Sequence, residues 1–424
     1  MIKSEYMPRL IDPMVERYLR VFGAVCIEGP KWCGKTWTSS YHSRSEFLVG
    51  AAEGNFQNKR LAEMAPSIVL EGETPRLLDE WQEVPQLWDA VRAEADKRAK
   101  KGQFIMTGSS APNYKGVLHS GAGRIGRLRM YPMSLFESQD SSGKVSLQDL
   151  CNGEAPSVMT GEVSLKSIAQ LIIRGGWPGN LSVPPEDAGL LPKEYLHAVI
   201  EDDAPRIDGC KRNIAKMRLL LRSLARNEST TATNKRLKAD IKAKDDEDID
   251  DDTVTTYLNI FACRFLLCNQ EPFAPSIRSS VRIKQAEKRH FADPSLACAI
   301  LNLSADGLIA DLNTMGFMFE SLCERDLRIY AETFGGKLYH YQDYNNREID
   351  AVIELDNGEW CAFEIKLGAN EIEAAAQSLL SVKNEIAKNG GKPPKVLCVI
   401  CGLSNAAYQR SDGVFVVPVT ALKA

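Results

Sequence analysis

The fold of this chain is decided by Gly29-Pro30-Lys31-Trp32-Cys33-Gly34-Lys35-Thr36, which spells the pattern G-x-x-x-x-G-K-[ST]. The residues before it, 22–28, form a short apolar run typical of a buried parallel strand, and residues 36–41 can open a helix. A glycine-rich turn between a strand and a helix aims free backbone N–H groups at an anion. The stretch therefore predicts a loop that cradles phosphate groups.

Each residue type in this loop has a chemical reason. The glycines let backbone amides approach a β-phosphate, Lys35 reaches the β and γ oxygens, and the Thr36 hydroxyl is a natural Mg²⁺ ligand. We therefore assign all eight residues, Gly29 to Thr36, to cofactor binding. The expected cofactors are ATP and Mg²⁺.

Size and composition limit what the chain can be. Its 424 residues predict about two to four domains, and 44% hydrophobic with 25% charged residues is ordinary for a globular protein. The net charge of −4 excludes a whole-protein attraction to nucleic acid. No apolar run has membrane-spanning length and the N-terminus lacks the apolar core of a secretory signal. We therefore expect a cytoplasmic protein without a membrane partner.

The pattern along the chain predicts three domains. Residues 1–140 alternate between strands and helices and predict an α/β domain with a parallel sheet, with helices at 9–20 and 89–99 and further strands at 46–49, 76–79, 103–107 and 127–131. Residues 165–295 are mostly helical, with an acidic run at 245–252. Residues 310–424 predict a second α/β domain with helices at 317–332 and 371–388 and strands at 337–341, 348–355, 359–365, 396–401 and 414–418.

A phosphate loop needs a partner acid at the end of a neighbouring strand. Asp79 and Glu80 end the expected strand 76–79, so Asp79 should hold the Mg²⁺ shell and Glu80 should polarise the attacking water. The next strand ends near Thr107 and Ser109, and a hydroxyl at that edge can read the γ-phosphate. We take Glu80 and Thr107 as catalytic residues and Asp79 with Thr36 as metal ligands.

An arginine that reaches the transferring phosphoryl group would stabilise its developing charge. The glycine-rich stretch 121–129 carries Arg124, Arg127 and Arg129. Arg124, in the flexible part, is the candidate arginine finger, and solvated surface arginines are the alternative. A finger that acts on a neighbouring subunit would require a homo-oligomer.

A family resemblance appears in five short motifs, Pro8-Arg9-Leu10-Ile11-Asp12, Ile27-Glu28-Gly29-Pro30-Lys31-Trp32, Leu78-Asp79-Glu80-Trp81-Gln82, Thr107-Gly108-Ser109 and Gly175-Gly176-Trp177-Pro178. Together they resemble a family of prokaryotic AAA-type P-loop ATPases whose core is followed by a C-terminal domain of unknown function. Residues 288–296 are similar to that C-terminal domain. The resemblance implies ATP binding and, by analogy, places 175–178 at a hinge near the adenine; a tight turn packed by Trp177 is the alternative.

The last domain carries a second constellation. Asp350, followed by Glu364-Ile365-Lys366, resembles the D…(D/E)-x-K core of restriction-endonuclease-like proteins. The resemblance implies Mg²⁺ held by Asp350, Glu364 and the Ile365 carbonyl, with Lys366 beside the attacking water and Glu320 completing the shell. The same alternation of charged and apolar residues is typical of any half-exposed strand. Nuclease activity therefore stays open.

The helical segment 165–295 predicts a winged-helix-like domain, with Asp252 as the N-cap of its last helix. A basic stretch follows that helix and is expected to form the wing: Arg278, Arg282, Lys284, Lys288 and Arg289. The helix would expose Thr255, Thr256, Asn259 and Arg264 toward bases, yet the acidic run beside it repels phosphates. A protein-interaction role, with the acidic run as a solvated loop, is equally compatible.

These patterns predict an ATP-hydrolysing switch that uses Mg²⁺ and is coupled to a nuclease-like or DNA-associated C-terminal domain. The alternative is a regulatory or protein-interaction module in which ATP sets the conformation and the C-terminal domain is inactive. ATP-dependent DNA binding without cleavage is a third interpretation. The sequence leaves open whether DNA, a second copy of the chain or another protein is the partner.

Overall fold

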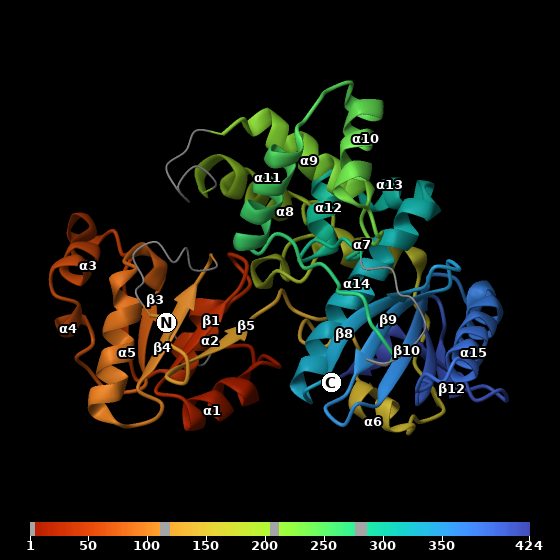
Figure 1. Ribbon diagram of the computed structural model, residues 1–424, viewed down its shortest axis with the longest axis horizontal. Coiled ribbons are helices and arrows are strands. Elements are labelled where there is room, and N and C mark those ends of the chain that lie inside the picture. The colour runs from red at the N-terminus through yellow and green to blue at the C-terminus, as the bar shows by residue number, and fades with distance from the viewer. Residues whose placement is uncertain (1–4, 111–118, 204–211, 276–285) are drawn as a thin grey trace. The chain divides into compact units, whose positions relative to one another are not determined.

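The computed structural model describes residues 5–110, 119–203, 212–275 and 286–424 (Figure 1). Of the sites expected above, the wing residues Arg278, Arg282 and Lys284 lie outside these ranges. The chain divides into two compact units, one made of Met1–Pro132 with Ile260–Leu266 and one made of Met133–Asn259 with Leu267–Ala424. The helical segment and the last α/β domain fall mostly in the same unit, so the division into three domains stays a prediction.

The first unit contains the expected parallel sheet. Its five strands pair in the order β2-β3-β4-β1-β5, and every pair is parallel. The strands are β1 Ala24–Glu28, β2 Ser45–Leu48, β3 Arg76–Asp79, β4 Phe104–Gly108 and β5 Ile125–Arg129. Parallel strands end at one edge, so the loop after β1, Asp79 and Thr107 are brought to the same side of the sheet.

Helices cover both faces of this sheet because successive β1 residues point to opposite sides. Val25 and Ile27 pack with Val15 of α1 (Asp12–Val21), whereas Ala24 and Cys26 pack in the cluster of Trp88 from α5 (Gln86–Arg98). The remaining helices are α2 Lys35–His42, α3 Glu53–Met64, α4 Pro66–Val69 and the 3₁₀ turn η2 Trp81–Glu83. The result is a three-layer α/β/α unit.

Strand β5 begins two residues before the expected range 127–131. Gly126 lies inside it, where a Cβ would meet the Phe22 ring at 2.5 Å and the Tyr18 ring at 2.7 Å. A glycine usually weakens a strand, so the sequence predicted a later start for β5. Here the missing side chain of Gly126 makes room for the Phe22 and Tyr18 rings.

The second unit is built on a mixed sheet of seven strands in the order β7-β12-β13-β11-β10-β9-β8. Strand β11 runs parallel to β10 and β13, and the other pairs are antiparallel. The strands are β7 Val158–Met159, β8 Lys337–Gln342, β9 Glu348–Glu354, β10 Trp360–Lys366, β11 Val396–Cys401, β12 Ala406–Gln409 and β13 Phe415–Pro418. A small parallel pair joins β6 Val145–Ser146 to β14 Leu422–Lys423.

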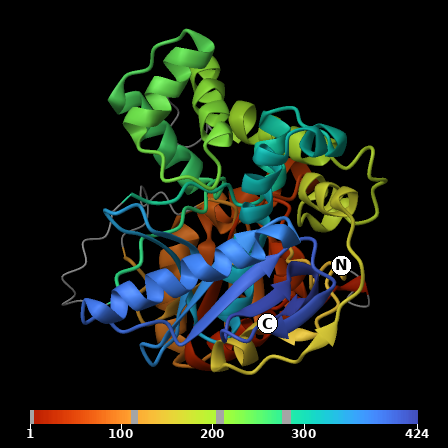
Figure 2. The ribbon, with the colours of Figure 1, turned by 90° about the vertical axis from the view of Figure 1, so that its right-hand side faces the viewer.

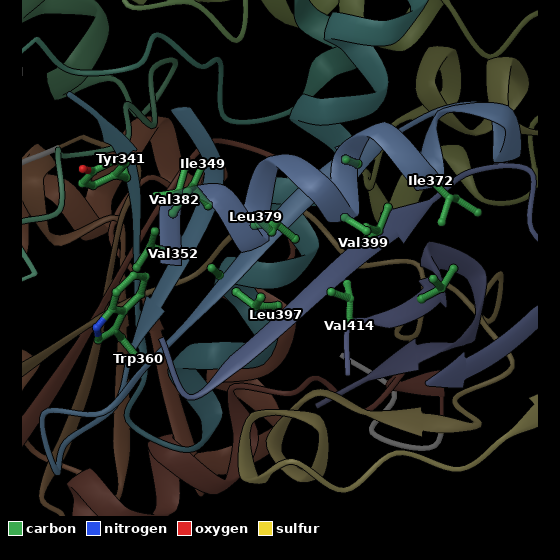
Figure 3. Packing of buried hydrophobic residues seen from close by; sticks show 14 of the residues in the cluster. Tyr341, Ile349, Val352, Trp360, Ile372, Leu379, Val382, Leu397, Val399 and Val414 are labelled. Carbon is green, nitrogen blue, oxygen red and sulfur yellow. The ribbon is translucent and has the colours of Figure 1, made fainter. Parts of the chain in front are cut away.

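One face of this sheet is covered by α15 (Ile372–Lys388), which lies across the strands in Figure 2. Figure 3 shows Leu379 and Val382 of α15 pointing toward Leu397 and Val399 of the sheet, with Trp360 in the same buried cluster. A second helix, α14 (Leu312–Thr333), contacts β8, β9 and β10. The expected second α/β domain is therefore present, while its restriction-endonuclease-like assignment stays a prediction.

The other helices of this unit are α6 Leu147–Asn152, α7 Leu165–Arg174, α8 Leu190–His197, η4 Ala198–Asp203, α9 Ile214–Arg226, α10 Asn234–Asp245, α12 Pro294–Ile300 and α13 Ala305–Ala310, with the 3₁₀ turns η3 Pro178–Asn180, η6 Ala369–Glu371 and η7 Val419–Ala421. Helix α11 (Asp251–Cys263) begins in this unit, and its residues 260–263 are assigned to the first unit. After α11, antiparallel bridges join Leu267 to Phe291 and Gln270 to Lys288. Three helices before a hairpin is the order expected of a winged helix, and that assignment stays a prediction. Within the described ranges, no helix combines the length and the apolar character that crossing a membrane requires.

The acidic run is only in part the solvated loop expected above. Residues 246–250 form no helix or strand and are mostly exposed, but both ends of the run belong to helices. Asp245 is the last residue of α10 and pairs with Arg222 at 2.9 Å and Arg226 at 2.7 Å. The N-cap of α11 is Asp250 rather than Asp252, because the Thr253 N–H donates to Asp250 Oδ1 at 2.7 Å. Parts of the run therefore hold helices together and cap them.

The turn at residues 175–178 is packed by its tryptophan. A Cβ on Gly176 would lie 2.1 Å from Met133 O, so only glycine fits there. Trp177 is fully buried, and its indole N–H donates to Ser295 Oγ at 2.9 Å. These contacts are those of the structural alternative, and a link to the adenine stays a prediction.

Candidate functional site

The phosphate loop follows β1, and α2 starts at its last lysine. A Cβ on Gly29 would lie 2.2 Å from Met130 O, and Gly34, just before α2, has φ 105°. Both positions therefore require glycine, for space at the first and for backbone conformation at the second. The buried Lys35 folds back so that its Nζ donates to Pro30 O at 2.7 Å. The loop thus closes around its own lysine.

Arg9 ties this loop to the rest of the unit. One guanidinium nitrogen donates to Cys33 O at 2.7 Å and another donates to Tyr131 O at 3.0 Å. Arg9 is itself buried. Arg9 belongs to a motif that carried the family resemblance, but the sequence predicted no functional role for it. Its partner Cys33 is 24 positions away, and no local sequence pattern predicts a contact over that separation.

Asp79 joins three elements at the edge of the sheet. Its Oδ1 accepts hydrogen bonds from Thr36 Oγ1 at 2.9 Å and from Thr107 Oγ1 at 2.6 Å. Burial raises the pKa of Asp79, and the charge of Glu80 raises it further, while the two hydroxyls oppose the shift. The Thr36 and Asp79 oxygens are hard ligands side by side, which fits a Mg²⁺ ion that keeps its other positions for phosphate oxygens and water.

Glu80 is held in an uncommon backbone conformation, with φ 56° and ψ 48°. Its N–H donates to Thr107 Oγ1 at 2.9 Å, and its Oε2 accepts from Ser109 Oγ at 2.8 Å and from Gln82. Left-handed conformations of non-glycine residues persist only where neighbours enforce them and are concentrated at functional sites. The structure thus brings Thr107 to one acid and Ser109 to the other.

Arg124 does not lie near this edge. The parallel register pairs Ala24 with Ile125, so Arg124 precedes β5 at the end of the sheet opposite the phosphate loop. Its Nε lies 2.9 Å from Asp96 Oδ1. A role for Arg124 at the phosphate loop of its own chain does not fit this position, and a role on a second copy stays a prediction. Of the three arginines in 121–129, Arg129 is paired in register with Glu28 and lies at the loop edge.

The second constellation also converges. Lys366 Nζ lies 3.2 Å from Asp350 Oδ2 and 2.8 Å from Glu364 Oε2. The Ile365 N–H donates to the same Asp350 oxygen at 2.9 Å. Glu320 joins from α14 through a shared partner, Lys288, which ion-pairs with it. All four residues expected from the sequence are therefore members of one cluster.

Lys288 occupies the centre of this cluster. Besides Glu320, its Nζ lies 3.6 Å from Glu324 Oε1 and 3.7 Å from Asp350 Oδ1. The sequence predicted Lys288 as an exposed cation of a wing, and this expectation was wrong, since the residue is only 7% exposed. The antiparallel bridge with Gln270 turns its side chain inward, which periodicity over such a short strand does not predict.

His290 extends the cluster two residues further along the same bridged segment. Its Nε2 lies 2.5 Å from Glu324 Oε2, and its Nδ1 lies 3.2 Å from Glu228 Oε1. Sequence reasoning missed Lys288, His290, Glu228 and Glu324 as partners. Two signals pointed to them: the alternation of Lys288 and His290, and the spacing of Glu320 and Glu324 by one helical turn on the predicted helix 317–332.

The described ion pairs of this cluster join five carboxylates to three basic groups, the carboxylates being Glu228, Glu320, Glu324, Asp350 and Glu364 and the basic groups Lys288, His290 and Lys366. Burial raises the pKa of Glu320 to about 8 and that of Glu364 well above its usual range. Burial would also raise the pKa of Asp350, but Lys288 and Lys366 hold it at about 2. Burial therefore favours a bound proton on Glu320 and on Glu364.

A metal ion does not fit this arrangement. Among the described residues, no group of three or more His, Cys, Asp or Glu side chains is placed to hold one. The reason is visible in the contacts, since Lys288 and Lys366 take the positions between the carboxylates that a cation would need. As described, the cluster is a buried ion-pair network.

Comparisons with known proteins agree with the site in the first unit. Residues 22–139 match a family described as an AAA domain, which supports a P-loop ATPase that binds ATP. Residues 165–307 and 315–422 match two domains of unknown function, DUF8612 and DUF4143. A Walker-type ATPase of Pyrococcus abyssi overlaps with a TM-score of 0.43 at 14% identity, covering 70% of this chain and 97% of that one. No curated protein matches the chain.

Proposed function

We propose that this protein is a Mg²⁺-dependent ATP hydrolase. The observation that carries the proposal is the pair of hydrogen bonds that Asp79 Oδ1 accepts from Thr36 and Thr107. They join the phosphate loop, the acid of β3 and the end of β4 in one place, with Glu80 beside them. The match of residues 22–139 to an AAA domain supports the same function.

Each residue has a task in this reaction. Lys35 would exchange Pro30 O for the β and γ oxygens of ATP, and the loop amides would bind the β-phosphate. Thr36 and Asp79 would hold Mg²⁺, which neutralises charge on the transferring phosphoryl group. Glu80 would polarise the attacking water, oriented by its hydrogen bonds with Ser109 and Gln82. Thr107 is positioned between the two acids and would couple them to the γ-phosphate.

Two variants and one control test this function. Lys35→Ala should abolish ATP binding and turnover, and Glu80→Gln should keep ATP binding while turnover falls by about 10²-fold or more. Glu83→Gln is the matched control, because Glu83 lies in the same segment but pairs with Lys59 at the surface. Circular dichroism checks that each variant is folded. A folded Lys35→Ala that releases phosphate at the normal rate would refute the proposal.

We infer that the second unit binds a partner and does not cut nucleic acid, with ATP setting its conformation. One observation favours this regulatory interpretation. The expected nuclease acids Glu320, Asp350 and Glu364 are ion-paired with Lys288 or Lys366. Incubating DNA with Mg²⁺ or Mn²⁺ decides between the two. Metal-dependent cleavage by the natural protein that is lost in Asp350→Ala would establish a nuclease instead.

DNA remains the partner with a specific surface to test. Thr255, Thr256 and Asn259 are exposed on α11, whereas the fourth expected residue, Arg264, follows the end of the helix and is half-buried. We would infer that α11 binds DNA if the full chain binds DNA in the presence of ATP, more weakly at higher salt, and if Asn259→Ala loses this binding. Binding that is unaffected by the substitution would leave a protein partner, including a second copy of this chain, which sedimentation at several concentrations would detect.

A further inference from the structure

An exposed aromatic surface continues from the phosphate loop along α2. Trp37 directly follows Thr36, and Tyr41 comes four residues later, so both lie on the same face of the helix. They are 42% and 46% exposed, whereas Thr38, Ser39 and Ser40 are buried. Two large rings in one exposed strip beside a ligand loop are a candidate contact surface.

The N-terminal segment adds a third ring and fixes it in place. Tyr6 stacks on Tyr41 with ring centroids 4.4 Å apart and an interplanar angle of 20°. The Tyr6 hydroxyl donates to Asp12 Oδ1 at 2.7 Å and lies 2.9 Å from Thr38 Oγ1. Burial raises the pKa of this hydroxyl, so it stays protonated and keeps its bond to Asp12. The two tyrosine rings are thus held on α2 before any ligand arrives.

We propose that Trp37, one helical turn from the stacked Tyr6 and Tyr41 rings, stacks on the base of the bound nucleotide and selects purine nucleoside triphosphates. The inference rests on the proposed ATP site and assigns the side chain that contacts the base of the nucleotide. Once the β- and γ-phosphates occupy the loop amides and Lys35, the α-phosphate, ribose and base must leave along the start of α2. The exposed side chain that directly follows Thr36 there is Trp37.

Stacking explains the kind of selectivity expected. Every base has a π-face, so an aromatic platform holds the base without reading its hydrogen-bonding edge. A two-ring purine covers more of Trp37 than a pyrimidine does. ATP and GTP should therefore bind with similar affinity, and both should bind more tightly than UTP.

Calorimetric titration with Mg²⁺ present tests the proposal, using ATP, GTP, UTP and inorganic tripolyphosphate as the phosphate-only probe. Trp37→Ala should weaken ATP binding about tenfold or more, the usual effect of removing one aromatic platform, and leave tripolyphosphate binding within about twofold. Trp37→Phe should restore most of the lost affinity. Tyr344→Ala, which removes an exposed ring of the second unit, is the control.

The readout separates this inference from the ATP site itself. If Lys35→Ala binds both ATP and tripolyphosphate normally, the proposed site fails. If ATP and tripolyphosphate both need Lys35, but Trp37→Ala has the same ratio of ATP affinity to tripolyphosphate affinity as the natural protein, only the stacking of Trp37 on the base is overturned. Should Trp37→Ala not fold by circular dichroism, Trp37→Leu, which keeps an apolar side chain without a ring, decides by the same ratio, and an unchanged ratio there overturns the platform.

Discussion

Raising the pH from 6.5 to 9 should destabilise the second unit by removing a proton from His290. This side chain is 4% exposed and lies between the carboxylates of Glu324 and Glu228. Burial would lower the pKa of the imidazolium, but these two carboxylates raise it from 6.5 to about 9. Lys288 Nζ lies 3.6 Å from Oε1 of the same Glu324, and the charge of Glu324 also acts on His340 of β8.

The sign follows from the direction of the shift. The folded state holds the proton more tightly than the unfolded chain, so the stabilisation is fully present below pH 6.5 and is lost as the pH rises through 9. A shift from 6.5 to about 9 corresponds to about 3 kcal/mol of unfolding free energy. Glu320 acts in the same direction, because its folded-state pKa, raised by burial to about 8, makes it release a proton over this range.

Hydrogen–deuterium exchange of peptides from α14 and β9 measures the effect in the full chain. After correction for intrinsic exchange, protection in the natural protein should fall by at least about a hundredfold between pH 6.5 and 9, which is the part that His290 alone supplies. His290→Gln should be less stable at pH 6.5 and should show a flatter pH dependence, with only the Glu320 part remaining. A flat profile in the natural protein, or an undiminished slope in His290→Gln, would refute the reasoning.

Three further results are expected. Gly29→Ala should lose most ATP binding in calorimetry, because its Cβ would lie 2.2 Å from Met130 O; unchanged affinity would contradict the close approach. Thr107→Val should lower kcat at least tenfold and cost about 1–3 kcal/mol in thermal unfolding, since it strips hydrogen bonds from Asp79 and Glu80. Lys288→Met should cost about 3–5 kcal/mol in urea unfolding, because it leaves buried carboxylates unpaired; a stability equal to the natural protein would show that protons replace the lysine without cost.

The phosphate loop was predictable because its determinants are local. Strand, glycine turn and helix start lie within about twenty consecutive residues, and each residue type has a reason that holds in any fold that places a strand before it. The acids at Asp79 and Glu80 were predictable for a related reason, since strands of a parallel sheet end at a common edge. The position of Arg124 was not, because the length and register of β5 decide at which end of the sheet it lies.

The buried ion-pair network of the second unit could be predicted from the sequence only in part. Asp350, Glu364 and Lys366 follow one another on adjacent strands, so the sequence could propose their meeting. Lys288 and His290 carry the same charge pattern as a solvated wing, and only the packing of their strand against α14 turns them inward.

The sequence by itself determined the phosphate loop, the five strands of the first sheet, and which acids follow which strands, since these depend on neighbours along the chain. The tertiary structure alone decided that Arg9 ties the loop to Tyr131, that Thr107 joins Asp79, and that Lys288 is buried among carboxylates. Each of these contacts joins residues far apart in sequence. Their energies arise only after burial has removed water from the charged and polar groups involved.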